Sequence, residues 1–188
     1  MSIYKQLQQK ELSSTPIKVC VIGCGRFGSM IIFQIKYIPG MEVSVICDLN
    51  IKRAITVASE AGISESNLKV HGSVDSINDS IKKNEVSIVD DASIAVLSNV
   101  DVVVEATGNP LAGAHNAINA IQNQKHVAMV TVETDVLIGP ALTKLASENN
   151  VVYSLAYGDQ PALIEEMYDW AKSLGFDVIA VGKGTKHV

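Results

Sequence analysis

Residues 17–28 read IKVCVIGCGRFG, an apolar run that leads into three glycines with the spacing GxGxxG. A second apolar run, residues 41–47, ends at Asp48, about 20 residues beyond the last of these glycines. Both runs predict buried strands, and the apolar segment between them predicts a helix. A glycine-rich turn between a strand and a helix, followed at this distance by an acidic residue, is typical of a dinucleotide-binding fold.

Each glycine has its own predicted role in such a fold. Gly23 permits the tight turn, Gly25 lets the backbone approach a pyrophosphate, and Gly28 lets the helix pack closely on the strand. The N–H groups at the start of the helix, where Arg26 and Phe27 lie, would face the phosphates. The alternative is a glycine-rich turn that holds no ligand.

Asp48 is the predicted ligand of the adenosine ribose, because its carboxylate would accept hydrogen bonds from the ribose hydroxyls. A carboxylate there repels a 2′-phosphate and so favours NAD over NADP. Lys52 and Arg53 follow closely, however, and either cation would neutralise that phosphate. The choice between NAD(H) and NADP(H) therefore stays open, as does a simpler role for Asp48 as the N-cap of the next helix.

Beyond this motif, strands and helices continue to alternate, which predicts a doubly wound, mainly parallel α/β sheet of the Rossmann type. We expect strands at residues 17–22, 41–47, 86–89, 100–104, 126–132, 151–156 and 176–181. We expect helices at residues 3–12, 29–37, 51–61, 74–83, 90–97, 111–122, 136–148 and 161–174. Residues 1–15 would form a helical extension, and residues 16–188 an NAD(P)-binding domain.

Composition narrows the class of protein. Among 188 residues, 47% are hydrophobic, which is enough for a sizeable core, and the net charge of −5 argues against a nucleic-acid partner. No apolar run predicts a membrane span or a signal peptide, so we expect a cytoplasmic protein. Cys20, Cys24 and Cys47 lie in or beside predicted strands and are expected to be buried thiols. The four histidines lack metal-ligand spacing, so no metal site is predicted; His115 and His126 are expected to be structural.

Polar residues follow two further strands, at the edge of the sheet where ligands bind. Thr107 and Gly108 are the preferred candidates to border the nicotinamide, because residues 109–110 could merely start a helix. Glu133 and Asp135 end the next predicted strand and would position a polar substrate or take a proton, or instead cap the following helix.

The last two strand-end turns offer more chemistry. Residues 157–161 place Asp159 among a phenol and an amide where substrate would lie, although Asp159 could cap the next helix. Residues 182–186 carry Lys183 and Lys186 between glycines, which suits binding a phosphate or polarising a carbonyl. The competing interpretation of that segment is a solvated tail.

Four segments carry a resemblance to a known group: residues 105–110, 125–130, 153–161 and 182–186. They resemble homoserine dehydrogenase-like oxidoreductases with a C-terminal SAF domain, a group that includes DXR-like 1-deoxy-D-xylulose 5-phosphate reductoisomerases of isoprenoid synthesis. The resemblance implies NAD(P)H-dependent reduction of a small polar carbonyl or sugar-phosphate substrate, with NADPH as the reductant in the DXR-like members. It further implies a substrate and dimerisation domain that these residues do not contain, and a possible homo-oligomer.

In this scheme Lys183 or Lys186 polarises the carbonyl or holds a substrate phosphate, while Asp159 and Glu133 orient hydroxyls. Residues 133–134 read Glu-Thr where homoserine dehydrogenases carry Asn-Lys, which disfavours homoserine as substrate. Two alternatives remain. One is a sugar oxidoreductase of the glucose–fructose oxidoreductase type, whose Glu-Lys-Pro signature is replaced here. The other is a dinucleotide-binding sensor without catalysis.

Overall fold

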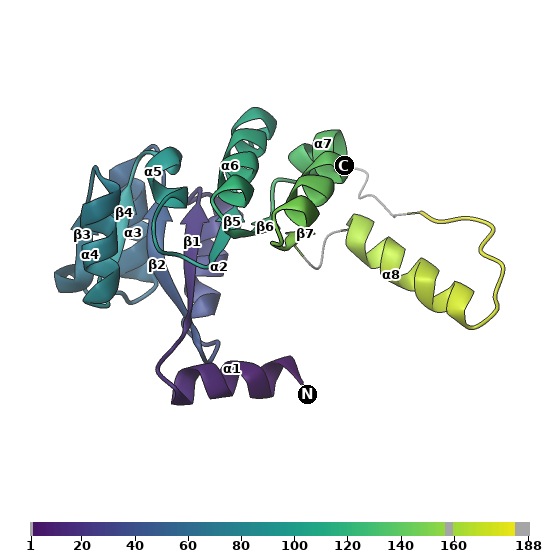
Figure 1. Cartoon of the computed structure of the whole chain (residues 1–188), viewed down its shortest axis with the longest axis horizontal. Coiled ribbons are helices and arrows are strands. Elements are labelled where there is room, and N and C mark those ends of the chain that lie inside the picture. Colours follow the sequence, from purple (N-terminus) through teal and green to yellow (C-terminus); the bar gives the residue numbers. More distant parts are fainter. Residues whose placement is uncertain (1, 157–159, 183–188) are drawn as a thin grey trace. The chain divides into compact units, whose positions relative to one another are not determined.

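The computed structural model describes residues 2–156 and 160–182 (Figure 1). The chain forms two compact units, residues 1–154 and 155–188. Asp159, Lys183 and Lys186, three of the predicted catalytic residues, lie outside the described residues.

A seven-stranded sheet organises the first unit, with the strand order β3-β4-β2-β1-β5-β6-β7. All five strand pairs whose register is resolved are parallel, which confirms the predicted doubly wound α/β fold. The strands are β1 Ile17–Ile22, β2 Met41–Cys47, β3 Leu68–Val70, β4 Val86–Val89, β5 Val102–Glu105, β6 His126–Met129 and β7 Tyr153–Leu155.

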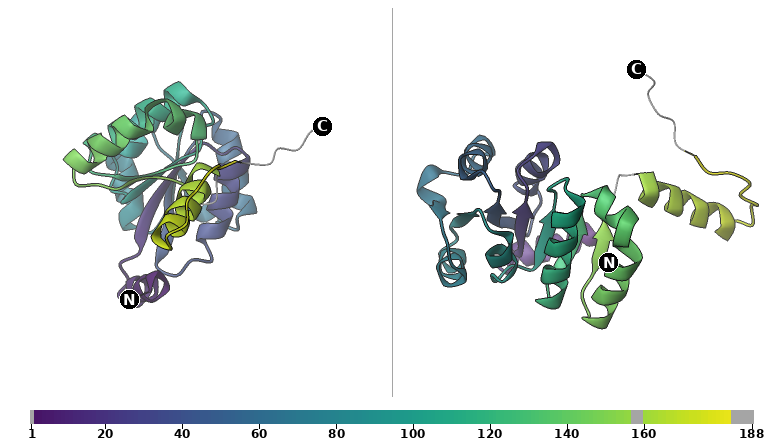
Figure 2. Two further views of the ribbon diagram at one scale, coloured as in Figure 1. Left: turned by 90° about the vertical axis from the view of Figure 1, so that its right-hand side faces the viewer. Right: turned by 90° about the horizontal axis from the view of Figure 1, so that it is seen from above.

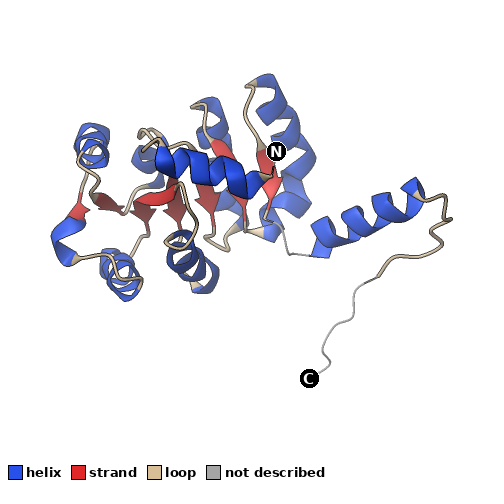
Figure 3. Ribbon diagram, turned by 90° about the horizontal axis from the view of Figure 1, so that it is seen from below, coloured by secondary structure: helices blue, strands red, loops and turns tan. Residues whose placement is uncertain are grey.

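Helices cover both faces of this sheet (Figures 2 and 3). They are α2 Arg26–Ile35, α3 Ile51–Glu60, α4 Val74–Lys82, α5 Ala92–Val96, α6 Pro110–Gln122 and α7 Val132–Glu148, with a 3-10 turn at Glu65–Asn67. The N-terminal helix α1, Ile3–Leu12, has no buried residue and lies below the sheet in Figure 1. The second unit contains α8, Gln160–Ser173. None of the described helices combines the length and apolar character that a membrane crossing requires.

The core explains why β1 is central. Val19, Cys20 and Val21 are fully buried because helices lie on both faces of the strand and β2 and β5 flank it. Cys24 and Cys47 are buried free thiols like Cys20, as their positions in the sequence predicted. The carboxyl ends of β1, β2 and β5 therefore form a rigid rim, on which the site is built.

The predicted strand at residues 126–132 is wrong in its second half. β6 ends at Met129, and α7 begins at Val132. The chain turns there because the N–H groups of Val130 and Thr131 both donate to the carbonyl of Glu105, after which the N–H of Thr134 donates to the carbonyl of Thr131. Glu133 and Asp135 thus lie in the first turn of a helix and do not end a strand.

The predicted strand at residues 176–181 is also wrong: the structure describes no strand there. Gly175 has a φ of +84°, and the N–H of Phe176 donates to the carbonyl of Ala171, an arrangement that ends α8 with a left-handed glycine. Alternating apolar residues alone therefore misled the prediction. The short strand β3 and the 3-10 turn before it were not predicted.

Candidate cofactor-binding site

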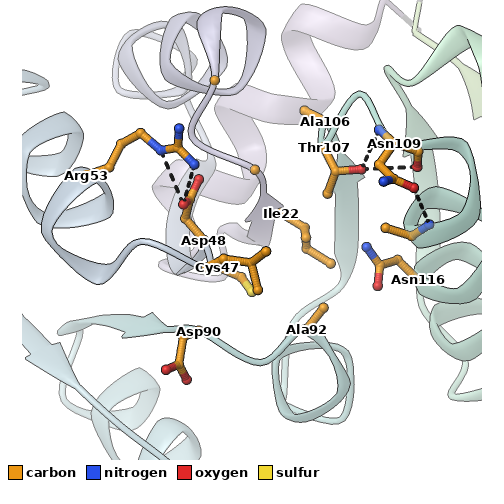
Figure 4. A pocket seen from close by; sticks show the side chains of 14 residues that line it. Ile22, Cys47, Asp48, Arg53, Asp90, Ala92, Ala106, Thr107, Asn109 and Asn116 are labelled. Atoms are coloured by element: carbon orange, nitrogen blue, oxygen red, sulfur yellow. Dashed lines mark hydrogen bonds and ion pairs between the residues drawn. The ribbon is translucent and has the colours of Figure 1, made fainter.

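A cleft of about 310 Å³ opens at the carboxyl ends of the central strands. It is lined by Gly23, which follows β1, by Asp48, which follows β2, and by Thr107 in the turn after β5. Figure 4 shows Asp48 and Arg53 on one side of Ile22, and Thr107, Asn109 and Asn116 on the other. Ligands of open parallel sheets bind at such a rim, where neighbouring crossovers run in opposite directions.

The glycine-rich turn forms the floor of this cleft. Gly23 has a φ of +98°, and a Cβ there would lie 2.6 Å from the carbonyl oxygen of Ala106, so a larger residue would push β1 and β5 apart. A Cβ on Gly28 would overlap the carbonyl oxygen of Gly23. Both glycines are thus required by the protein itself, before any ligand is considered.

Gly25 differs from the other two glycines. It is the N-cap residue of α2, its φ is an ordinary −73°, and a Cβ there would meet no atom within 4 Å. The fold itself does not need a glycine at this position. The lack of a side chain at Gly25 instead leaves open space above the turn. The first N–H groups of α2 face outward from this turn, as a helix N-terminus requires of an anion site. Arg26 and Phe27 follow on α2 but do not line the cleft.

Asp48 is almost fully buried, with 5% of its surface exposed. Its Oδ2 accepts a hydrogen bond from the N–H of Cys24 at 2.7 Å, which ties the end of β2 to the glycine-rich turn. Its Oδ1 accepts from the N–H of Asn50 at 2.8 Å and from Arg53, whose Nη2 lies at 2.7 Å. Burial acts to raise the pKa of Asp48, but the hydrogen bonds from Arg53, Asn50 and Cys24 prevail and hold it below its usual value.

The capping alternative for Asp48 is wrong. Asn50 is the N-cap of α3, and its side chain accepts the N–H of Arg53 at 3.1 Å. Asp48 is therefore not engaged as a helix cap, although its two oxygens already accept four hydrogen bonds within the protein. Arg53 lines the cleft with its side chain 53% exposed, whereas Lys52 is exposed and does not line it.

The turn after β5 forms the opposite wall. Thr107 and Asn109 line the cleft, and Gly108 does not, although its N–H donates to the hydroxyl of Thr131 at 3.0 Å. Asn109 also caps α6, because its Oδ1 accepts the N–H groups of Leu111 and Ala112, both at 3.0 Å. The helix-start interpretation of residues 109–110 is thus confirmed, yet the capping residue still faces the cleft.

Glu105, which sequence reasoning did not select as a site residue, lies directly behind this wall with none of its surface exposed. Its Oε1 accepts from the hydroxyl of Thr107 at 2.5 Å, from the N–H of the same residue at 3.2 Å, and from the side-chain amide of Asn116 at 3.4 Å. Its Oε2 is one of two buried side-chain polar atoms in the described part of the chain that have no hydrogen-bond partner. The sequence signal that could have identified Glu105 is its position as an acidic residue at the end of an otherwise apolar strand.

Asn116 and Asp90 also line the cleft and were not predicted as site residues. Asp90 directly follows β4, so the strand-end rule that selected Thr107 would have found it. Asn116 lies in the middle of α6, 8% exposed, and no local signal marks it.

The acidic pair on α7 is divided between two environments. Glu133 is exposed in the first turn of the helix. Asp135 accepts the hydroxyl of Tyr153 at 2.8 Å. Burial, followed by this hydrogen bond and the negative charges of Asp135 and Glu105, raises the pKa of Tyr153 well above its usual value. Neither acid lines the cleft.

Within residues 2–156 and 160–182, no group of three or more histidine, cysteine, aspartate or glutamate side chains is placed to hold a metal ion. Nδ1 of His126 accepts the N–H of Val152 at 2.9 Å, which is a structural role. His115 is exposed on α6.

Comparison with known proteins supports this assignment of the fold. Residues 158–188 match the family described as oxidoreductase DRL, catalytic domain. No curated protein matches the chain. Among solved structures, an oxidoreductase from Agrobacterium radiobacter in complex with NAD+, L-tartaric acid and magnesium is 16% identical, with a TM-score of 0.61 over 86% of this chain and 41% of that chain.

Two further structures have the same fold. Scyllo-inositol dehydrogenase from Lactobacillus casei, with bound NAD(H) and scyllo-inositol, is 14% identical, with a TM-score of 0.58 over 84% of this chain and 42% of that one. The WlbA dehydrogenase from Bordetella pertussis, in complex with NADH and UDP-GlcNAcA, is 19% identical, with a TM-score of 0.60 over 85% and 43%. The matched region is less than half of each solved chain, and at these identities the likeness is one of fold.

Proposed function

We propose that this chain is the cofactor-binding part of an NAD(P)H-dependent oxidoreductase. The observation that carries the proposal is the cleft itself, in which a buried carboxylate, Asp48, is hydrogen-bonded to the glycine-rich turn through the N–H of Cys24. The match of residues 158–188 to an oxidoreductase catalytic domain and the dinucleotides in the neighbouring structures support it.

The cleft suggests how the cofactor would lie. The pyrophosphate would rest above Gly25, at the N-terminus of α2, where no side chain intrudes. The adenosine ribose would then reach Asp48 beside β2, and the nicotinamide would extend to Thr107 and Asn116 beside β5. When bound, the reduced nicotinamide supplies a hydride for a substrate carbonyl carbon.

The pairing of Asp48 with Arg53 bears on the choice between NAD(H) and NADP(H). Oδ1 already accepts three donors, while Oδ2 accepts one and can take a ribose hydroxyl as well. The exposed guanidinium beside it can bind a 2′-phosphate. We propose that the site accepts both cofactors, with Arg53 rather than Lys52 as the phosphate ligand.

For the chemical step, Lys183, Lys186, Asp159 and Glu133 remain the proposed substrate-binding and proton-handling residues. The first three lie within the segment matched to the oxidoreductase catalytic domain. A lysine ammonium beside the carbonyl oxygen would stabilise the charge that develops there. Lysine-to-alanine changes in the active enzyme should then reduce turnover far more than cofactor affinity, and unchanged turnover would refute these roles.

Two substrate classes compete. Reduction or oxidation of a sugar or polyol, as in the glucose–fructose oxidoreductase type, is supported by neighbours whose structures hold scyllo-inositol or a UDP-sugar. The homoserine dehydrogenase-like or DXR-like assignment, with its SAF domain and NADPH, rests on the four resembling segments, two of which overlap the family match. On the present support we favour a polyhydroxylated small molecule as substrate, a class that includes sugar phosphates.

Calorimetric titration of the 188-residue chain with NADH and with NADPH at matched salt tests the proposal. Binding of either cofactor, abolished by a change at Gly25, is the expected result. Absence of binding by both would overturn the assignment. Tight binding, without turnover of any sugar, polyol or aldehyde by the protein joined to its catalytic part, would favour the sensor alternative.

A further inference from the structure

The feature that the proposed function leaves unexplained is Glu105. A fully buried carboxylate costs several kcal/mol of solvation, and folded proteins therefore keep one only where it is paired or useful. No ion pair among the described residues includes Glu105, and Oε2 has no hydrogen-bond partner. Among the described residues, no cation is paired with this carboxylate.

Three hydrogen bonds converge on Oε1 of Glu105. The hydroxyl and N–H of Thr107 and the amide of Asn116 all donate to it, and none of these three donors carries a charge. Nearby, Asp135 and the hydroxyl of Tyr153 bring no positive charge. No cationic side chain among the described residues is thus hydrogen-bonded to Glu105.

The position of Glu105 relates this charge to the cleft. Both side chains that donate to it, Thr107 and Asn116, line the wall beside β5. Asp48 and Arg53 occupy the other side of Ile22, so the adenosine half of a dinucleotide belongs there and the nicotinamide half belongs at this wall (Figure 4). Glu105 thus lies one side chain behind the predicted position of the nicotinamide ring.

We propose that Glu105 sets the preference of the site for the oxidised cofactor, acting behind Thr107 as an electrostatic positioning residue. Oxidised and reduced nicotinamide rings differ by one unit of positive charge, and a fixed carboxylate attracts only the cation. Tighter binding of the oxidised form makes the bound reduced form a stronger hydride donor. This role rests on the proposed function, because it requires a nicotinamide in the cleft.

Thr107 has a defined part in this arrangement. A carboxylate can only accept, so the hydroxyl proton of Thr107 points to Glu105 at 2.5 Å. The oxygen of that hydroxyl accepts the N–H of Asn109 at 3.3 Å, and its second lone pair can take an N–H donor such as the carboxamide of the nicotinamide. Glu105 therefore acts on the charge of the ring through space and on its orientation through Thr107.

The test compares the dissociation constants of the oxidised and the reduced cofactor in wild type, Glu105→Gln and Glu85→Gln. Glu85 is a partly exposed carboxylate that precedes β4, at the amino ends of the strands, and serves as the matched control. We expect Glu105→Gln to shift the ratio of the two constants toward the reduced form by about tenfold or more, the size of a unit-charge effect over roughly 10 Å at an effective dielectric near 20. The control should leave the ratio unchanged.

A purely structural role would weaken both redox forms equally, and an unchanged ratio in Glu105→Gln would overturn the proposal. If that variant does not fold, Glu105→Leu, which replaces the buried charge by an apolar group of similar size, gives the same comparison. The wild-type ratio is an independent check, since binding of the reduced form more than about tenfold tighter than the oxidised form contradicts the expected electrostatic effect. Wild type that binds neither form would refute the proposed function instead.

Discussion

The guanidinium of Arg53 donates from both Nε and Nη2 to a single oxygen of Asp48, Oδ1, at 3.2 and 2.7 Å. The two residues are five positions apart, at the end of β2 and in the first turn of α3. An acid that would repel a 2′-phosphate is thereby joined to a cation that would bind one. The preference of the cleft for NAD(H) or NADP(H) is therefore expected to depend on both residues and not on Asp48 alone.

Replacing Arg53 should therefore separate the two cofactors. We expect Arg53→Ala to weaken NADPH binding by about tenfold or more, because a charge-assisted contact to the 2′-phosphate is lost, and to change NADH binding much less. Calorimetric titration with both cofactors measures this. Lys52→Ala is the matched control, and a larger effect there would identify Lys52 as the phosphate ligand.

The depressed pKa of Asp48 predicts a pH-dependent contribution to stability. Because its folded-state pKa lies below the unfolded value, the contribution is present above about pH 4 and is lost as pH falls through the folded pKa. Asp48→Asn should lower the free energy of unfolding at neutral pH by about 1–3 kcal/mol, the range for hydrogen bonds to a charged group. Denaturant titrations of variant and wild type should converge toward pH 2.

Asp79→Asn provides the comparison for that experiment. Asp79 is exposed, and its ion pair among the described residues is with Lys82, at 3.0 Å. Its removal should change stability far less at neutral pH, since an exposed ion pair contributes little. Equal losses in the two variants would mean that the hydrogen bonds to Asp48 do not stabilise the fold.

The glycines of the turn should respond differently to alanine. Gly25→Ala should change the free energy of unfolding by less than about 1 kcal/mol, since the new Cβ meets no atom within 4 Å, but should weaken cofactor binding strongly. Gly28→Ala should destabilise by at least about 2 kcal/mol, since its Cβ overlaps the carbonyl of Gly23. Thermal unfolding and calorimetry on both variants separate a ligand-required glycine from a fold-required one. If Gly25→Ala bound the cofactor as tightly as wild type, the proposed position of the pyrophosphate above this turn would be wrong.

The three cysteines should be inert in the folded protein. Burial, followed by the charge of Asp48, raises the pKa of Cys24 to about 12, and burial and nearby negative groups raise the pKa of Cys47 to about 12. Since the thiolate is the reactive form, a chromogenic disulfide reagent at neutral pH should label none of the three thiols until denaturant is added. Rapid labelling of one thiol in the native protein would show that the turn opens.

The raised pKa of Tyr153 predicts how the free energy of unfolding changes at alkaline pH. Its folded-state pKa is raised, so its contribution to stability is present below the unfolded value of about 10 and is lost as pH rises above it. Tyr153→Phe should cost about 1 kcal/mol at neutral pH, through the hydrogen bond to Asp135, and should lose less stability than wild type between about pH 9 and 11. The buried thiols titrate in both proteins, so the difference in unfolding free energy isolates Tyr153.

The sequence predicted β1 and β2 closely because its signals agree. Residues 17–22 and 41–47 are apolar, β-branched and bounded by glycine or acid, and both strands were placed at their observed bounds. The end of β6 was predicted wrongly for a physical reason. In residues 126–132 strand propensity continues through Val130, but tertiary hydrogen bonds to the carbonyl of Glu105 turn the chain into α7.

Residues of the cleft could be predicted where a short sequence motif fixes their position. They could not be predicted where segments distant in the sequence come together in the fold. Gly23 and Asp48 follow from spacing alone. Asn116 and the burial of Glu105 depend on how α6 packs against β5, which no short motif encodes. The Tyr153 hydroxyl reaching Asp135 is a similar case, since the two residues come from different elements and only the folded chain brings them together.

The position of β1 between β2 and β5 has a consequence for how such a protein diverges. The pair that would select the phosphate state of the cofactor follows β2, and the buried acid that would bias its oxidation state ends β5, with β1 between them and no hydrogen-bond partner shared. Changes at sites without common partners tend to be additive. A lineage could therefore exchange one nucleotide pool for another and keep its preference for one redox form of the cofactor, or reverse that preference within the same pool.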